Sequence, residues 1–229
     1  KKFYKLITSK KALMFSIIAL SLPAITEMFF NTMLGVADTI MISQMISKEA
    51  LSAVGFANQI VFTLIFVFSS FNTGAIALIS RAYGENDYEK LEKVAEQNIV
   101  INIIIGSFIA LLAFLGRNYI FGIYNVTEEV YKNTILYFNI ILIGFIPMFL
   151  SFAYSAIMRG SGDTKTPMKI TIFANVLNII GNYVLITGLG PFPQMGIAGA
   201  ALSTSISRII AVSIYIYMFY FKESKRKLK

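Results

Sequence analysis

The chain has 229 residues, of which 56% are hydrophobic and 14% are charged; its mean hydropathy is +0.70 and its formal net charge is +8. Because soluble domains carry about 25% charged residues, this composition excludes an ordinary soluble domain and indicates an integral membrane protein. The sequence contains no His and no Cys, which excludes disulfides, thiolate or imidazole metal ligands and nucleophile–histidine catalysis. We therefore expect neither an enzyme nor a resident cofactor.

Six apolar runs are long enough to cross a bilayer as helices, since a span needs about 20 residues and lipid cannot satisfy open backbone groups. In chain order they cover residues 12–46, 51–80, 94–115, 130–158, 168–188 and 196–221. We predict an all-α integral membrane fold, a six-transmembrane-helix bundle over 1–221, followed by a basic cytoplasmic tail or inter-bundle linker at 222–229. Bends are expected at Pro23 or Gly35 in the first helix and at Pro147 in the fourth.

Lys and Arg are distributed unevenly between the two sets of loops. Sixteen of them fall in the N-terminal segment, around the loops after the second and fourth runs, and in the C-terminal tail, whereas three fall in the other loops. By the positive-inside rule, both termini lie in the cytoplasm. The positive charge is thus explained by topology, and we expect a multi-pass protein of the cytoplasmic membrane, with the lipid bilayer and not nucleic acid as a partner.

The first run carries two carboxylates and an amide on one helical face. Positions 11 residues apart complete about three turns, so Glu27 and Asp38 nearly eclipse, with Asn31 between them. A charge at the bilayer centre costs at least about 2.5–3.5 kcal/mol, so this stripe should face a protein interior or a water-filled cavity. We expect Asp38 to be functional; the alternative is a structural ion pair with Arg208.

The fifth run has a matching stripe, because Asn175, Asn178 and Asn182 recur at helical spacing. The sixth run opens with the small residues GIAGAALSTSIS, which permit close helix packing and include Thr204. We predict a polar chamber among the first, fifth and sixth helices, although an amide such as Asn175 can also simply hydrogen-bond a neighbouring helix. The residues expected on the substrate cavity or pathway are Glu27, Asn31 and Asn175.

Several short motifs occur in a fixed order along the chain. They are LSLPAI and VADTIMIS in the first run, LSAVGFANQI and LISRAYGEND in the second, MRGSGDTKTPM after the fourth, NVLNIIGNYVLITGLG in the fifth and GIAGAALSTSISR in the sixth. Together they resemble the N-terminal half of the multidrug and toxic compound extrusion (MATE) family of transporters. The resemblance implies one half of a twelve-helix fold and export of organic cations or drugs by alternating access, coupled to H+ or Na+.

The resemblance also implies a cation-coupling site, with Na+ as one candidate ion. Its residues would be Asp38, Asn178, Asn182 and Thr204. Asn182 departs from the family pattern, which has an Asp there, so the site would hold one carboxylate instead of two. Coupling by protonation would then depend on Asp38, whereas Na+ can be held by one carboxylate with amide and hydroxyl oxygens.

The resemblance covers only one bundle, so the expected partner is the missing C-terminal six-helix bundle or a second copy of this chain. Two alternative functions stay open. One is a lipid-linked sugar flippase of the same superfamily, which would line its cavity with several Arg or Lys. The other is a non-transporting fragment.

Overall fold

The computed structural model describes the backbone of residues 2–222 and the side chains of residues 11, 14–66 and 69–220. Residues 223–229 of the predicted tail lie outside this description. The helices are α1 (Lys2–Met45), α2 (Lys48–Gly84), α3 (Tyr88–Gly122), α4 (Glu128–Ile143), α5 (Phe145–Gly160), α6 (Lys165–Thr187) and α7 (Ile197–Tyr217), followed by a π-helical turn, η1 (Met218–Lys222).

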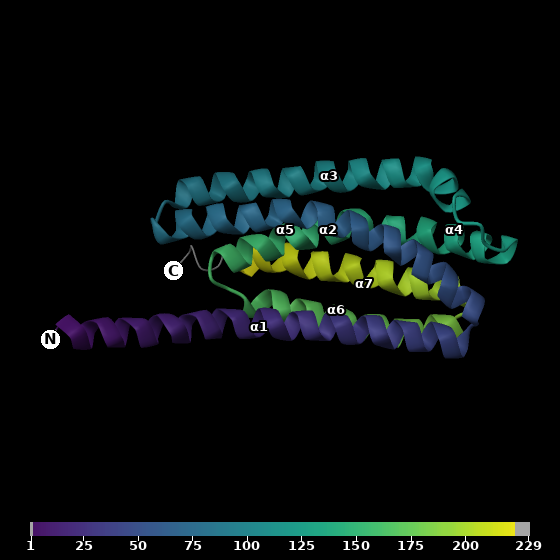
Figure 1. Cartoon of the computed structure of the whole chain (residues 1–229), viewed down its shortest axis with the longest axis horizontal. Coiled ribbons are helices and arrows are strands. Elements are labelled where there is room, and N and C mark those ends of the chain that lie inside the picture. The colour runs from purple at the N-terminus through teal and green to yellow at the C-terminus, as the bar shows by residue number, and fades with distance from the viewer. Residues whose placement is uncertain (1, 223–229) are drawn as a thin grey trace.

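The helices lie side by side along one long axis, with α1 and α6 adjacent on one side of the bundle and α3 on the opposite side (Figure 1). Five of them are long and apolar enough to span a membrane, and α4 with α5 forms a sixth span that is bent by 46°. The all-α, six-helix membrane fold is thereby confirmed. Most of the helices are longer than the spans predicted from the sequence. Which residues of each helix lie within the bilayer remains a prediction.

The bend in the fourth span occurs at Gly144, three residues before the predicted Pro147. Gly144 ends α4 and begins α5, so Pro147 falls in the first turn of α5, where a missing N–H leaves no intrahelical bond unmade. By contrast, α1 continues through Pro23 and Gly35 without a break. In the fourth span, proline thus lies at the start of a new helix, α5. In the first span, the helix continues on both sides of Pro23.

The loop in the motif MRGSGDTKTPM is a tight turn between α5 and α6. Gly162 adopts a positive φ of 87°, which favours glycine. The Asp163 carboxylate then accepts hydrogen bonds from the N–H groups of Lys165 and Thr166, at 3.1 and 3.0 Å. Because these donors are otherwise free at a helix N-terminus, Asp163 fixes where α6 starts.

The packing of α6 against α7 depends on small residues. Gly199 of α7 lies so close to α6 that a Cβ added there would be 2.6 Å from the Leu185 carbonyl oxygen. The hydroxyl of Ser203, one turn further along α7, donates to the Asn178 carbonyl at 2.9 Å. Small residues allow this backbone approach, which brings the polar face of α6 within reach of α7.

We predict that Gly199→Ala destabilises the protein, because the new methyl group overlaps rigid backbone of α6. Overpacking of this kind costs about 1–3 kcal/mol. In detergent, the Tm should fall by several degrees. The matched control is Gly74→Ala in α2, since a Cβ at Gly74 meets nothing within 4 Å; its Tm should stay the same or rise. Equal Tm changes in the two variants would contradict close α6–α7 packing.

Candidate cation site and substrate cavity

Three side-chain hydrogen bonds join α1 to α6, and in each the two partners are 144 residues apart. The constant offset means that α1 and α6 run parallel and stay in one register over about three turns. We call this set the α1–α6 polar ladder. Its pairs are Glu27–Thr171 at 3.1 Å, Asn31–Asn175 at 3.0 Å and Asp38–Asn182 at 2.6 Å.

The residues predicted for the cation site come together where α1, α6 and α7 meet. The Asn182 amide donates to Asp38 Oδ1 at 2.6 Å. The Asn178 amide lies between Asp38 and Thr204. With its nitrogen toward Asp38 it donates at 3.2 Å, and its oxygen then accepts from the hydroxyl and the N–H of Thr204, both at 3.1 Å. The four predicted residues therefore form one connected cluster.

One acceptor in this cluster has no partner. The Oδ1 atom of Asn182 is buried, and no described residue donates a hydrogen bond to it. The nitrogen of the same amide faces the Asp38 carboxylate, and the Asn178 amide connects that carboxylate to the Thr204 hydroxyl. A carboxylate with neighbouring amide and hydroxyl oxygens is the donor set that hard cations accept. The cluster thus brings one carboxylate, two amides and one hydroxyl together.

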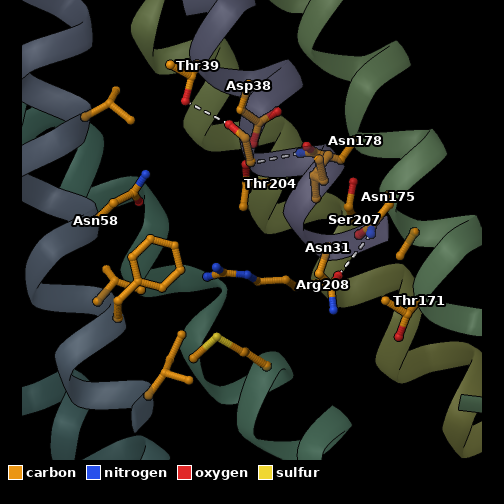
Figure 2. Close-up of a pocket in the computed structure, with 18 of the residues that line it drawn as sticks. Asn31, Asp38, Thr39, Asn58, Thr171, Asn175, Asn178, Thr204, Ser207 and Arg208 are labelled. Atoms are coloured by element: carbon orange, nitrogen blue, oxygen red, sulfur yellow. Dashed lines mark hydrogen bonds between the residues drawn. The ribbon is translucent and has the colours of Figure 1, made fainter. Parts of the chain in front are cut away.

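A cavity of about 500 Å³ opens beside this cluster. Its walls come from every described helix of the bundle except α3, and they are mostly apolar. Asn31, Asp38 and Thr204 line it together with Asn175 and Asn178 (Figure 2). Asn182 holds Asp38 from behind the wall and is not among the lining residues.

Sequence reasoning missed several polar groups of the cavity, among them Asn58, Tyr137, Thr171 and Ser207. Asn58 and Thr171 have polar side chains within apolar runs, which is the same signal that identified Asn31. Tyr137 carried no such signal, because Tyr is common in membrane helices. Arg208 was noticed, but as a structural counterion.

Glu27 lies in a different environment from Asp38. It does not line the cavity; instead, its Oε2 forms an ion pair with Nη2 of Arg159 at 2.7 Å. Its other oxygen accepts from Thr171. Arg159 is in the last turn of α5, so this pair joins α1 to the α5 end of the α5–α6 turn. Glu27 was predicted to lie on the substrate pathway. The structure places it outside the cavity wall, in an ion pair with Arg159.

The alternative explanation for Asp38, an ion pair with Arg208, is not what the structure shows. None of the ion pairs among the described residues includes Arg208. Asp38 is held by the amides of Asn182 and Asn178 instead. The two charges thus line the same cavity without neutralising one another by direct contact.

Comparison with known proteins agrees with this architecture. Residues 23–184 match the family model MatE. A probable multidrug resistance protein NorM from Thermotoga maritima is 32% identical over 207 residues, which is 90% of this chain and 44% of that protein. The uncharacterized transporter YisQ from Bacillus subtilis is 34% identical over 199 residues, or 86% of this chain and 43% of that protein.

A solved structure gives the same result for the fold. A MOP superfamily transporter from Pyrococcus furiosus, described as having a binding pocket of reverse polarity, superposes with a TM-score of 0.83 at 26% identity. The match covers 90% of this chain and 45% of that one. The chain therefore spans about half the length of the relatives that it matches, and corresponds to their N-terminal half. On these grounds it belongs to the MatE family of transporters.

Proposed function

We propose that this chain forms half of a cation-coupled (H+ or Na+) antiporter, which exports organic cations or drugs across the cytoplasmic membrane by alternating access. The observation that carries the proposal is the position of Asp38. It is the only carboxylate among the described residues that line the cavity, and it belongs to a polar cluster in which the buried Asn182 Oδ1 accepts no hydrogen bond from a described residue. An ionisable residue inside a membrane bundle is a functional candidate by default.

The coupling step follows from the hydrogen bonds of Asp38. As a carboxylate it accepts charge-assisted bonds from two amides, which hold α1 against α6. Charge-assisted bonds are worth about 1 kcal/mol more than neutral ones. Protonation would therefore weaken the Asp38 end of the α1–α6 polar ladder. The equilibrium constant between the two states of the transporter would change about five- to tenfold. A Na+ ion at the same oxygens would have the same consequence by competing for them.

Asn182 shapes this step, because its amide cannot take a proton. The charge change of the cluster is then limited to one unit, carried by Asp38. The other end of the ladder, held by the Glu27–Arg159 ion pair, would stay fixed while the Asp38 end responds. We propose that α1 is anchored near Glu27 and mobile around Asp38.

The complete transporter would need a second bundle, from the C-terminal half of a longer protein or from a second copy of this chain. The parallel α1 and α6 agree with the topology expected from the loop charges, in which both helices cross in the same direction and both termini are cytoplasmic.

The lipid-linked sugar flippase alternative requires several cavity cations, whereas Arg208 is the only Lys or Arg among the described residues that line the cavity.

The central prediction concerns transport. In proteoliposomes that hold this chain, a pH or Na+ gradient should drive efflux of a cationic dye such as ethidium. Asp38→Asn removes the ionisable group but keeps a side chain that can accept a hydrogen bond from Asn182. Gradient-driven flux should therefore fall at least tenfold, while passive leak is unchanged.

Two controls make this transport result interpretable. Glu89→Gln changes an exposed carboxylate that pairs only with Lys93 on the surface, so its flux should equal that of the parent. Imposing the pH and Na+ gradients separately identifies the coupling ion. Flux that persists in Asp38→Asn would contradict coupling through Asp38, and no flux from a folded parent chain would contradict a transporter assembled from two copies.

The anchoring role of Glu27 leads to a stability prediction. Glu27→Gln keeps the hydrogen bond to Thr171 but leaves the Arg159 guanidinium without its counterion. Loss of a charged partner at this partly buried site should cost about 1–3 kcal/mol and lower the Tm by several degrees. In a double-mutant cycle with Arg159→Gln, the two effects should be less than additive.

The matched control for the anchor is Glu85→Gln, which breaks an exposed ion pair with Arg81 of similar length, 2.9 Å. Exposed pairs contribute little, so its Tm should stay close to that of the parent. Equal Tm losses for Glu27→Gln and Glu85→Gln, or full additivity in the cycle, would show that Glu27 and Arg159 do not act as a pair.

A further inference from the structure

Arg208 is built into the wall of the cavity by the break in the fourth span. Its Cδ packs against Gly144, where an added Cβ would be only 3.1 Å away. The aliphatic part of the Arg208 side chain therefore lies where the Cβ of any residue other than glycine at position 144 would crowd it. From there the side chain extends across the cavity toward the wall that carries Asn58 (Figure 2). The break between α4 and α5 thus allows a cation from α7 to reach the cavity.

The guanidinium group forms no ion pair with a described residue, and one of its nitrogens is unpartnered. No described carboxylate lies within ion-pair distance of it, and its buried Nη1 atom donates no hydrogen bond to any described residue. The nearest charge of opposite sign on the cavity wall is Asp38, which is already engaged by the two amides. A buried cation without a partner is costly, so an anion that entered the cavity would recover free energy.

The surroundings of Arg208 suit one chemical class. A guanidinium offers a planar fork of donors that matches carboxylate, sulfonate or phosphate oxygens. The neighbouring wall is apolar and includes Val54, Phe62, Met148 and Phe152. An amphipathic molecule with an acidic end could place its anionic group at Arg208 and its apolar body along this wall.

We propose that Arg208 is an anion-recognition position, which selects substrates that carry an acidic group on an apolar body, whether or not they also carry a cationic group. This inference rests on the proposed function in one respect: it takes the cavity as the substrate site. It adds a substrate class that cation binding at Asp38 does not provide.

The same geometry sets how the two charges of the cavity act on a bound anion. Arg208 attracts it, and an ionised Asp38 on the wall of the same cavity repels it. Neutralising Asp38 should therefore strengthen the binding of an anion, whereas it should weaken the binding of a cation. A substrate held through Arg208 would respond to the coupling ion with the opposite sign from a substrate held through Asp38.

Binding of three matched probes to the protein in lipid nanodiscs tests the proposal. Each probe has the same nitrobenzoxadiazole fluorophore and six-carbon chain, which ends in a carboxylate, a methyl or an ammonium group. Fluorescence anisotropy is measured for each, with empty nanodiscs subtracted. The parent should bind the carboxylate probe at least about tenfold more tightly than the methyl probe, as expected for one charge-assisted contact.

Four variants separate recognition from packing. Arg208→Met should remove the carboxylate preference and change binding of the methyl probe less than twofold. Arg208→Lys should retain most of the preference, and Asp38→Asn should tighten carboxylate binding several-fold. Arg81→Met, which removes an exposed arginine at the end of α2, should change none of the three affinities.

The proposal is overturned by equal affinity of the parent for the three probes, by tightest binding of the ammonium probe, or by a parallel loss of all three in Arg208→Met with no rescue by lysine. These outcomes are independent of the transport test, because binding needs no gradient. Carboxylate binding without gradient-driven flux would contradict the antiporter only. Flux that depends on Asp38, without a carboxylate preference, would contradict the role of Arg208 only.

Discussion

The register between α1 and α6 is the constraint on which the rest of the structure depends. Polar groups inside a membrane bundle must find partners within the protein, since lipid offers none. Here Glu27, Asn31 and Asp38 find them on a single neighbouring helix at one constant offset. A slip of one residue would break all three bonds together, so the ladder fixes the depth of Asp38 relative to α6 and, through the close α6–α7 packing, relative to Thr204.

The bundle contains two kinds of polar cluster. Between α2 and α3, Asn72 and Asn102 exchange hydrogen bonds at 3.1 Å, and Asn102 also donates to the Asn98 carbonyl, so these amides satisfy one another. Around the cavity, by contrast, Asn182 Oδ1 and Arg208 Nη1 are buried, and no described residue forms a hydrogen bond with either atom. Satisfied amides stabilise helix packing, whereas unpaired groups next to a cavity leave binding capacity for an ion or a ligand.

Local periodicity was sufficient to predict the helices, the polar faces of the first and fifth spans and their meeting in one chamber. It did not predict the ion pair between Glu27 and Arg159, because these residues are 132 positions apart and no local pattern joins them. The bend was expected at Pro147 but occurs at Gly144. Arg208 of α7 packs against Gly144, and a contact between distant segments of this kind cannot be read from local sequence.

The account assigns the coupling charge to Asp38, with Glu27 as an anchor. Infrared difference spectroscopy of the protein in lipid bilayers tests this assignment most directly, because a protonated carboxyl group has its own carbonyl band. At pH values well above about 4, where exposed carboxylates titrate, lowering the pH or removing Na+ should produce a band that is absent in Asp38→Asn and unchanged in Glu27→Gln. A band that persists in Asp38→Asn, or the lack of any band that responds to pH or Na+, would contradict coupling through Asp38.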